Sequence, residues 1–319
     1  MLILSPNPCF DAQFWVKDLI PGSVVRSLEN TYTPGGKGLN VAKVATTMGN
    51  TNFRLLVMLP KVEGSLFKEL LAPEKYDVTY LDIEGGIRKA ILVNKENSLE
   101  NTVIVGKGPD MQNGDWDRYL SLVKELVRPG EIVVEMGSLA SNYPSNAIEE
   151  LAKIVHDKGA KLLVDTSPAC FKTRGNSVLD FITPNLDEAE ALINNTSGDV
   201  YVVDDTDIEK RAMAAAEKLY GTVAHTVMIT TGKHGIALKT EKEHLWIPAY
   251  TVSDSAFKSS VGAGDSFVAG FVTYLEQNPG EFESAIRFGM STAAAQCETF
   301  EPGNLKKDRA LEIFKAGRA

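Results

Sequence analysis

The stretch EIVVEMGSLASNYPSNAIEELAKIVHDKGAKLLVD, residues 131–165, contains a complete strand–helix–strand unit. Its first and last segments, 131–136 and 160–165, are short apolar runs of the kind that forms strands buried on both faces. Residues 146–158 between them have apolar side chains at helical spacing, and Gly159 stands where a helix C-cap belongs. Strands joined through a helix in this way are the repeating unit of a doubly wound α/β sheet.

The same alternation extends over most of the chain. Further strand-like runs occupy residues 1–5, 53–59, 181–183 and 226–231. Further helical segments occupy residues 38–48, 115–127, 186–195 and 208–220, and Gly221 marks another C-cap. The end of the chain is mostly helical, over residues 265–277, 281–297 and 306–315. We therefore predict an α/β fold with a doubly wound, mostly parallel sheet and helices on both faces.

Two stretches interrupt this rhythm. Residues 12–33 are typical of two strands joined at Pro21-Gly22, and residues 87–105 are typical of a hairpin with a polar turn at 94–100. Neither has helices to cover both faces, so we expect them to pair into a small β-sheet that projects from the main domain. This sheet could be a lid over an active site, a dimer surface, or both. The main domain then comprises residues 1–11, 34–86 and 106–319.

Composition excludes several classes of protein. The net charge of −9 and the pI of about 5.1 argue against nucleic acid or an anionic membrane as the main partner, because both attract basic surfaces. The three cysteines are far apart and form no CxxC pair, which indicates neither a disulfide framework nor a structural zinc site. The N-terminal residues lack a basic leader, and no 18 apolar residues run together. We expect a cytoplasmic protein.

The sequence GAGD at residues 262–265 precedes a helical run. A Gly-rich turn that enters a helix offers free N–H groups to an anion, so Gly262, Ala263 and Gly264 are candidates for an anion hole and Asp265 for a base beside it. The alternative is that Asp265 only serves the helix start, where aspartate is common. A dinucleotide fingerprint would need glycine where Phe267 stands, and no Walker A sequence occurs.

A second Gly-rich turn lies in TPGGKGLNVAK, residues 33–43. Gly35 and Gly36 permit close backbone approach to a ligand, Lys37 adds charge, and Asn40 adds a donor and an acceptor. The alternative is an ordinary turn with a solvated lysine.

Three further candidates have equally simple alternatives. Asp11 follows the first strand, where α/β sheets bind ligands, although an ordinary turn also fits. Asn185 and Glu188 have the spacing of a capping box. Arg88 opens the second stretch of the small sheet and could hold a phosphate bidentately or be a solvated strand end.

Taken in order along the chain, these features resemble the ribokinase-like (phosphofructokinase B) family of sugar kinases. The order is N-P-x-x-D, G-G-K-G-x-N, an arginine-bearing hairpin, P-N-x-x-E, T-G-x-x-G (Thr231, Gly232, Gly235) and G-A-G-D-S. SPNPCFD at residues 5–11 together with Arg88 is most similar to the branch that holds 1-phosphofructokinase and tagatose-6-phosphate kinase. The resemblance spans nearly the whole chain.

The resemblance implies ATP-dependent phosphorylation of a ketohexose that already carries a phosphate, fructose 1-phosphate or tagatose 6-phosphate. Asp265 would be the general base, with Gly262, Ala263 and Gly264 as its anion hole. Asp11, Gly35, Gly36 and Asn40 would bind the sugar, and Lys37 and Arg88 its phosphate. Asn185 and Glu188 would position Mg²⁺ and the ATP phosphates, Glu188 through water, while Thr231, Gly232 and Gly235 would lie along the nucleotide. The resemblance also implies a monovalent cation in many members and a homodimer formed through the lid.

The chain departs from the family at several points. Cys9 and Phe10 replace small residues, GSLASNYP replaces the usual G-S-L-P around Ser138, and Thr183 replaces a lysine before Pro-Asn. The segment 250–262 is longer than usual, which leaves the nucleotide preference open. A kinase for an unphosphorylated sugar or nucleoside, and a binding protein of the same fold without turnover, therefore remain alternatives.

Overall fold

The computed structural model describes residues 1–96, 98, 101–171, 178–196 and 206–317. Within these residues, nine strands form the main sheet, in the order β13-β12-β11-β10-β9-β8-β1-β4-β5. All pairs from β11 to β5 are parallel, and the β11–β12 and β12–β13 pairs are antiparallel. The strands are β1 (Leu2–Ser5), β4 (Arg54–Val62), β5 (Asp77–Gly86), β8 (Ile132–Met136), β9 (Lys161–Asp165), β10 (Leu179–Ile182), β11 (Ala224–Thr230), β12 (Gly235–Lys239) and β13 (His244–Pro248).

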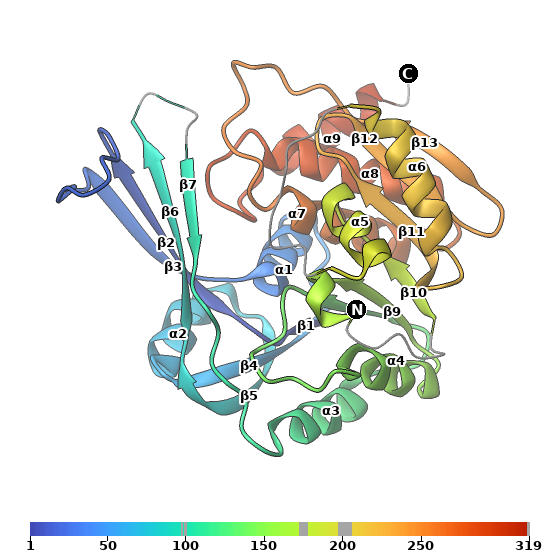
Figure 1. Cartoon of the computed structure of the whole chain (residues 1–319), viewed down its shortest axis with the longest axis horizontal. Coiled ribbons are helices and arrows are strands. Elements are labelled where there is room, and N and C mark those ends of the chain that lie inside the picture. Colours follow the sequence, from blue (N-terminus) through green and yellow to red (C-terminus); the bar gives the residue numbers. More distant parts are fainter. Residues whose placement is uncertain (97, 99–100, 172–177, 197–205, 318–319) are drawn as a thin grey trace.

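Helices cover both faces of this sheet (Figure 1). Alternate strand residues face opposite sides, so Ile3 joins one apolar core while Leu2 and Leu4 join the other. The first core includes side chains of α1 (Lys37–Thr47), α2 (Gly64–Leu71), α7 (Ala263–Gln277), α8 (Phe282–Gln296) and α9 (Lys307–Ala316). The second includes side chains of α3 (Asp115–Leu126), α4 (Ala147–Asp157), α5 (Leu186–Asn194) and α6 (Ile208–Leu219). The predicted doubly wound, mostly parallel α/β architecture is confirmed.

A separate four-stranded sheet projects from the main body (Figure 1). Its order is β3-β2-β6-β7, from β2 (Cys9–Val16), β3 (Glu29–Gly35), β6 (Arg88–Lys95) and β7 (Asn101–Val105). The two stretches predicted to pair do so, through parallel β2 and β6. Strand β2 begins at Cys9 and β3 ends at Gly35, closer to the main sheet than the sequence indicated. Residues 97, 99 and 100 of the predicted turn lie outside the described residues. We call this sheet the lid.

Helix α2, strand β5 and the two strands of the β12–β13 hairpin were not predicted. Helix α2 has only eight residues, and β5 is an edge strand with alternating exposure, so neither produces a long apolar signal. The hairpin depends on Gly235, whose φ of 144° and close approach to Ile247 O exclude a Cβ atom. In the part of the chain that the structure describes, no helix has the length and apolarity that a membrane span requires.

Strand β8 carries a buried carboxyl group in the middle of the sheet. Glu135 has no exposed surface, and its Oε2 accepts a hydrogen bond from Tyr119 Oη at 3.2 Å. Among the described residues, its Oε1 atom has no hydrogen-bond partner. Burial raises the pKa of Glu135 well above its usual range, so the folded protein holds this group in its neutral form.

We expect Glu135→Gln to raise the free energy of unfolding at pH 7.5 and to change it much less at pH 4.5. A group whose pKa is raised on folding contributes its full stability below the unfolded pKa and loses it as the pH rises, by up to about 1.4 kcal/mol per pH unit. Urea unfolding at both pH values measures the difference. Glu69→Gln, at an exposed position of α2, is the control. An equal effect of Glu135→Gln at both pH values would contradict this expectation.

Candidate active site

The start of helix α7 forms a tight turn supported by a proline. Gly262 is the N-cap, with a left-handed φ of 80°. A Cβ atom on Gly262 would lie 2.9 Å from Pro302 Cβ, so only glycine fits. The N–H of Ala263 donates to Ser260 O at 3.2 Å, so this amide is already used within the turn. The amides of Gly264 and Asp265 belong to the first helical turn, whose N–H groups have no acceptor inside a helix.

Asp265 lies in this first turn but does not cap the helix. No side-chain hydrogen bond caps α7, whose N-cap is Gly262, so the interpretation of Asp265 as a cap is wrong. Instead, Asp265 Oδ2 accepts a hydrogen bond from Asn40 Nδ2 at 2.8 Å. Burial raises the pKa of Asp265 to about 6, although the nearby ammonium of Lys37 opposes the shift. The carboxylate is thus buried, oriented by α1 and more basic than an exposed aspartate.

Lys37, the first residue of α1, belongs to a cluster of carboxylates beside Asp265. Its Nζ contacts Asp165 Oδ1 at 2.5 Å. Burial alone would lower the pKa of Lys37, but the carboxylates of Asp165, Asp265 and Glu188 outweigh it and raise the pKa. The ammonium group therefore stays charged at the point where these three acids converge. It is paired with Asp165, and this contact differs from the sugar-phosphate contact predicted for it.

Asp165 is the residue that our sequence reasoning missed. It ends β9, and its Oδ2 also accepts a hydrogen bond from Thr183 Oγ1 at 3.0 Å. Thr183 occupies the position where the resemblance led us to expect lysine. The rule that pointed to Asp11, a carboxylate at the carboxyl end of a buried strand, applies equally to Asp165 and could have found it.

Asn185 and Glu188 form a complete capping box at the start of α5. Glu188 N donates to Asn185 Oδ1 at 2.8 Å, and Asn185 N donates to Glu188 Oε2 at 2.9 Å. The capping alternative is therefore confirmed. Glu188 also interacts electrostatically with the charged cluster. Burial raises the pKa of Glu188, and the positive charge of Lys37 opposes that shift. The Glu188 side chain therefore both caps α5 and lies near the charged cluster around Lys37.

Asp11 and the glycines of the second turn lie on the lid side of the cluster. Asp11 is buried in β2, and its Oδ1 accepts a hydrogen bond from Cys9 Sγ at 3.3 Å. A Cβ atom on Gly35 would lie 2.1 Å from Asp11 Oδ2, so the carboxylate fills the space that a side chain would take. Gly36 has a φ of 108°, which favours glycine. The Oδ1 atom of Asn40 is buried without a hydrogen-bond partner among the described residues. Buried amide oxygens normally accept a hydrogen bond, so this atom is an unsatisfied acceptor in the described part of the site.

Arg88 lies at the base of the lid, beside Asp11. Its Nε and Nη2 donate to the backbone oxygen of Asn7, at 3.1 and 2.9 Å. Asn7 in turn donates through Nδ2 to Ser138 Oγ at 3.1 Å. The charge of Arg88 acts on the pKa of Asp11, although burial is the largest influence and raises it. Arg88 is therefore fixed at the entrance to the predicted sugar site.

A cavity of 770 Å³ adjoins the start of α7, and none of the described residues that line it belongs to a strand of the lid. Gly232, Gly235, Ala263 and Gly264 line it, but Thr231 does not. The Thr231 hydroxyl donates to Gly235 O at 2.7 Å and closes the turn between β11 and β12. The other lining residues are Thr230, Lys233, His234, Ile236, Ala249, Tyr250, Thr251, Val252, Asp254, Phe257, Ser260, Phe267, Met290, Ala293, Ala294 and Cys297. Its volume is in the range of small-molecule sites, and Ala263 and Gly264 of the α7 turn line part of it.

A larger cavity of 1410 Å³ lies at the opposite end of the strands, where their amino ends meet. Met1, Ile132, Lys161 and Thr226, at the amino ends of four parallel strands, help to line it. None of the predicted site residues does so. Because α/β sheets bind ligands at the carboxyl ends of their strands, we assign the chemistry to the smaller cavity and the adjoining cluster.

The described residues contain no group of three or more histidine, cysteine or acidic side chains placed to hold a metal ion. Mg²⁺ in phosphoryl-transfer sites usually keeps several waters and is held by one or two carboxylates together with substrate phosphates. Asp165 and Glu188, both close enough to Lys37 to act on its pKa, provide that kind of donor set. The site therefore fits a magnesium ion that arrives with a nucleotide.

Comparison with known proteins gives matches over most of the chain. The model of the pfkB family carbohydrate kinases matches residues 8–309. A 1-phosphofructokinase of Bacillus subtilis is 27% identical over 298 residues, which cover 93% of this chain and 92% of that protein. A tagatose-6-phosphate kinase of Staphylococcus epidermidis is 24% identical over 99% of this chain and 97% of that protein. The solved structure of phosphofructokinase-2 from Escherichia coli in complex with potassium superposes with a TM-score of 0.85 at 22% identity, covering 100% of this chain and 99% of that one.

Proposed function

The chain belongs to the pfkB family of carbohydrate kinases, and from that premise we propose that it transfers the γ-phosphoryl group of ATP to a hydroxyl of a phosphorylated ketohexose. Fructose 1-phosphate and tagatose 6-phosphate are the two candidate substrates. The observation that carries the proposal is the position of Asp265, buried beside the α7 turn, between the 770 Å³ cavity and the Asp11–Arg88 side of the site. The names of the curated relatives support the substrate class.

In this proposal the sugar lies against the second Gly-rich turn. Asp11 accepts hydrogen bonds from sugar hydroxyls, and the absence of a side chain at Gly35 leaves the space in which the Asp11 carboxylate lies. The unpartnered Oδ1 of Asn40 accepts another hydroxyl hydrogen bond. Arg88 binds the phosphate that the sugar already carries through its Nη1 group, since Nε and Nη2 donate to Asn7 O. Binding a sugar this way brings one hydroxyl to Asp265.

Asp265 then takes the proton of that hydroxyl as the phosphoryl group transfers. Its raised pKa makes it a better base than an exposed aspartate, while it stays largely ionised at neutral pH. The hydrogen bond from Asn40 fixes the carboxylate relative to the sugar. Base and sugar are thus positioned by the same helix, α1.

The amides of Gly262 and Gly264 and the N-terminus of α7 stabilise the charge on the transferring group. We reassign Lys37 to this group, because its ammonium lies among Asp165, Asp265 and Glu188. Asp165 and Glu188 would hold Mg²⁺, Glu188 through water, and the ion would neutralise charge on the ATP phosphates. The monovalent cation expected from the resemblance stays a prediction.

Release of ADP across a panel of acceptors tests the proposal. The panel contains fructose 1-phosphate, tagatose 6-phosphate, fructose, ribose and adenosine, each with Mg·ATP. We expect ADP release with at least one of the two sugar phosphates and little with the unphosphorylated acceptors. Turnover with only unphosphorylated acceptors would replace this substrate class by the second candidate. Nucleotide binding with no turnover on any acceptor would contradict the kinase assignment.

The lid is also the proposed dimer surface. Most of the exposed large apolar side chains among the described residues lie on it, and such patches favour contact with another protein surface. The exposed apolar residues on its strands and connection are Leu19, Ile20, Val24, Leu28, Val103, Ile104 and Val105.

The rate should depend on the ionisation of Asp265. Because the base must be deprotonated and its pKa is raised to about 6, we expect kcat/KM for the sugar phosphate to rise about tenfold per pH unit below pH 6 and to level off above it. A pH–rate profile from pH 4.5 to 8.5 measures this. Lys37→Met removes the charge that lowers the Asp265 pKa and should shift the midpoint to higher pH. A midpoint near pH 4 in the unmodified enzyme would contradict the assignment.

A further inference from the structure

A short turn after α8, residues 299–303, lies between the lid and the catalytic turn. On the lid side, the rings of Trp15 and Phe300 meet edge to face, with their centroids 6.1 Å apart. Trp15 belongs to β2, the same strand that carries Asp11. Through this contact the turn meets the lid directly.

On the other side, the same turn supports both halves of the catalytic machinery. Pro302 packs so closely on Gly262 that a Cβ atom there would lie 2.9 Å from Pro302 Cβ. Gly303 lies against α1, where a Cβ atom would come within 3.3 Å of Asn40 Cα. Gly262 shapes the anion-binding turn, and Asn40 orients Asp265. A shift of the 299–303 turn would therefore displace Asn40, which orients Asp265, and Gly262, which shapes the anion-binding turn.

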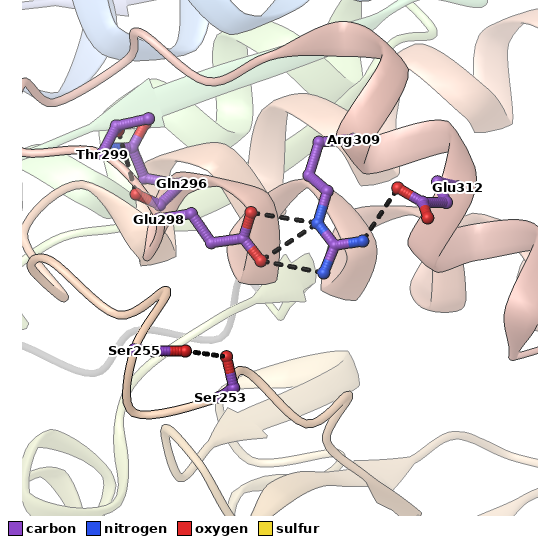
Figure 2. Close-up of polar contacts among 7 residues, drawn as sticks. All are labelled: Ser253, Ser255, Gln296, Glu298, Thr299, Arg309 and Glu312. Atoms are coloured by element: carbon purple, nitrogen blue, oxygen red, sulfur yellow. Dashed lines mark hydrogen bonds and ion pairs between the residues drawn. The ribbon is translucent and has the colours of Figure 1, made fainter.

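A wholly buried glutamine holds the turn in shape. Gln296, the last residue of α8, donates through Nε2 to Thr299 Oγ1 at 2.9 Å and to Glu301 O at 3.0 Å. Its Oε1 accepts from Gly303 N at 3.0 Å. Figure 2 shows Gln296 and Thr299 side by side at the end of α8. Three hydrogen bonds from one buried side chain thus hold Thr299, Glu301 and Gly303 together.

We propose that the 299–303 turn is a positioning device that couples the lid to the catalytic turn, with Phe300 as the residue that contacts the lid and Gln296 as its anchor. The inference rests on the proposed kinase function, since it states how the lid of that same site acts on the chemistry. When Trp15 rests on Phe300, Pro302 holds Gly262 and the α7 amides in place. When the lid lifts, the turn loses its contact with the ring of Trp15, and the anion site becomes less ordered.

The first test needs no catalytic activity. Hydrogen–deuterium exchange of the free full-length protein is followed in peptides that cover residues 299–303. Trp15→Ala should raise the exchange rate of these amides by roughly 2- to 13-fold, the usual strength of an aromatic pair. Trp15→Phe, which keeps a ring, should change it less. Unchanged exchange in Trp15→Ala would overturn the coupling, whatever reaction the enzyme catalyses.

The second test asks whether the contact reaches the chemistry. Phe300→Ala should lower kcat roughly 2- to 13-fold and raise the hydrolysis of ATP without sugar, while Phe300→Tyr restores both. In a double-mutant cycle, Trp15→Ala should add little to Phe300→Ala, because both remove the same contact. Additive losses would show that the two residues act separately and would overturn the proposal. An enzyme that fails the acceptor panel but passes the exchange test would contradict the kinase function alone.

Arg309→Ala provides the matched control. Arg309 Nε donates to both carboxylate oxygens of Glu298 at 3.0 Å, and its Nη1 donates to Glu312 Oε2 at 2.8 Å (Figure 2). The Arg309–Glu298 ion pair ties α9 to the chain just before the turn. Within the described part of the chain, Arg309 has no hydrogen bond or ion pair to residues 299–303 or to the lid. Arg309→Ala should therefore leave the exchange of the turn and kcat within twofold of the unmodified enzyme. A loss as large as that of Phe300→Ala would indicate general loosening and overturn the proposal.

Discussion

Asp265→Asn should lower kcat by ~10²–10⁴-fold, the usual contribution of a general base. Asparagine keeps the size of the side chain and an oxygen that can accept the hydrogen bond from Asn40 Nδ2, so the site should keep its shape. What is lost is the ability to take a proton from the acceptor hydroxyl. Steady-state kinetics with the active sugar phosphate give kcat, and titration with ATP shows that the nucleotide still binds.

A second buried aspartate, Asp115, provides a control that distinguishes a loss of catalysis from a loss of helix stability. Asp115 is also a buried acid in the first turn of a helix, α3, and its Oδ2 accepts a hydrogen bond from Gln112 N at 2.8 Å. Asp115→Asn keeps an oxygen for Gln112 N but removes the charge that pairs with Arg118 Nη1 at 3.0 Å and favours the start of α3. It should cost about 0.3–1 kcal/mol of stability and leave kcat within about twofold. If Asp265→Asn behaves in the same way, with near-normal turnover, Asp265 is not the base.

The order of elements could be read from the sequence because buried parallel strands and amphipathic helices leave strong, repeated patterns. The unit at 131–165 illustrates this: β8, α4 and β9 all lie within a residue or two of their predicted bounds. Short or half-exposed elements such as α2 and β5 leave weaker patterns and were not predicted. Local sequence therefore suffices for the framework and not for its edges.

The site was harder to predict because its chemistry depends on which strand ends meet. Gly262 and Asp265 stand together in the sequence, so their proximity needed no tertiary information. Lys37 pairs with Asp165, which lies 128 positions away in the sequence, and no local sequence pattern predicts this contact. The same holds for the bond from Asn40 to Asp265, which showed that the aspartate orients toward α1 rather than capping its own helix.

Arg88→Ala should raise the KM for the sugar phosphate roughly 10- to 100-fold, as expected when a charge-assisted hydrogen bond to phosphate is removed. The KM for ATP should change little, because Arg88 lies at the lid side of Asp11 and does not line the nucleotide cavity. Initial rates over both substrate concentrations give the two KM values. Arg88→Lys keeps the positive charge but lacks the planar guanidinium group. Its KM for the sugar phosphate should lie between those of the unmodified enzyme and Arg88→Ala.

The neighbouring lysine makes this test specific. Lys89 follows Arg88 in β6, so its side chain starts on the opposite face of the lid, and it forms an ion pair with Glu63. Lys89→Ala removes the same charge from the same strand and should change the KM for the sugar phosphate less than twofold. Equal effects of the two variants would mean that the lid attracts the substrate only through its overall charge. If Arg88→Ala leaves the KM for the sugar phosphate unchanged, the proposed contact between Arg88 and the phosphate is excluded, and an unphosphorylated sugar is the better candidate substrate. A large effect confined to Arg88 requires a directed contact with the substrate. Nε and Nη2 of Arg88 donate to Asn7 O, while no residue that the structure describes accepts a hydrogen bond from Nη1, which can therefore bind a phosphate.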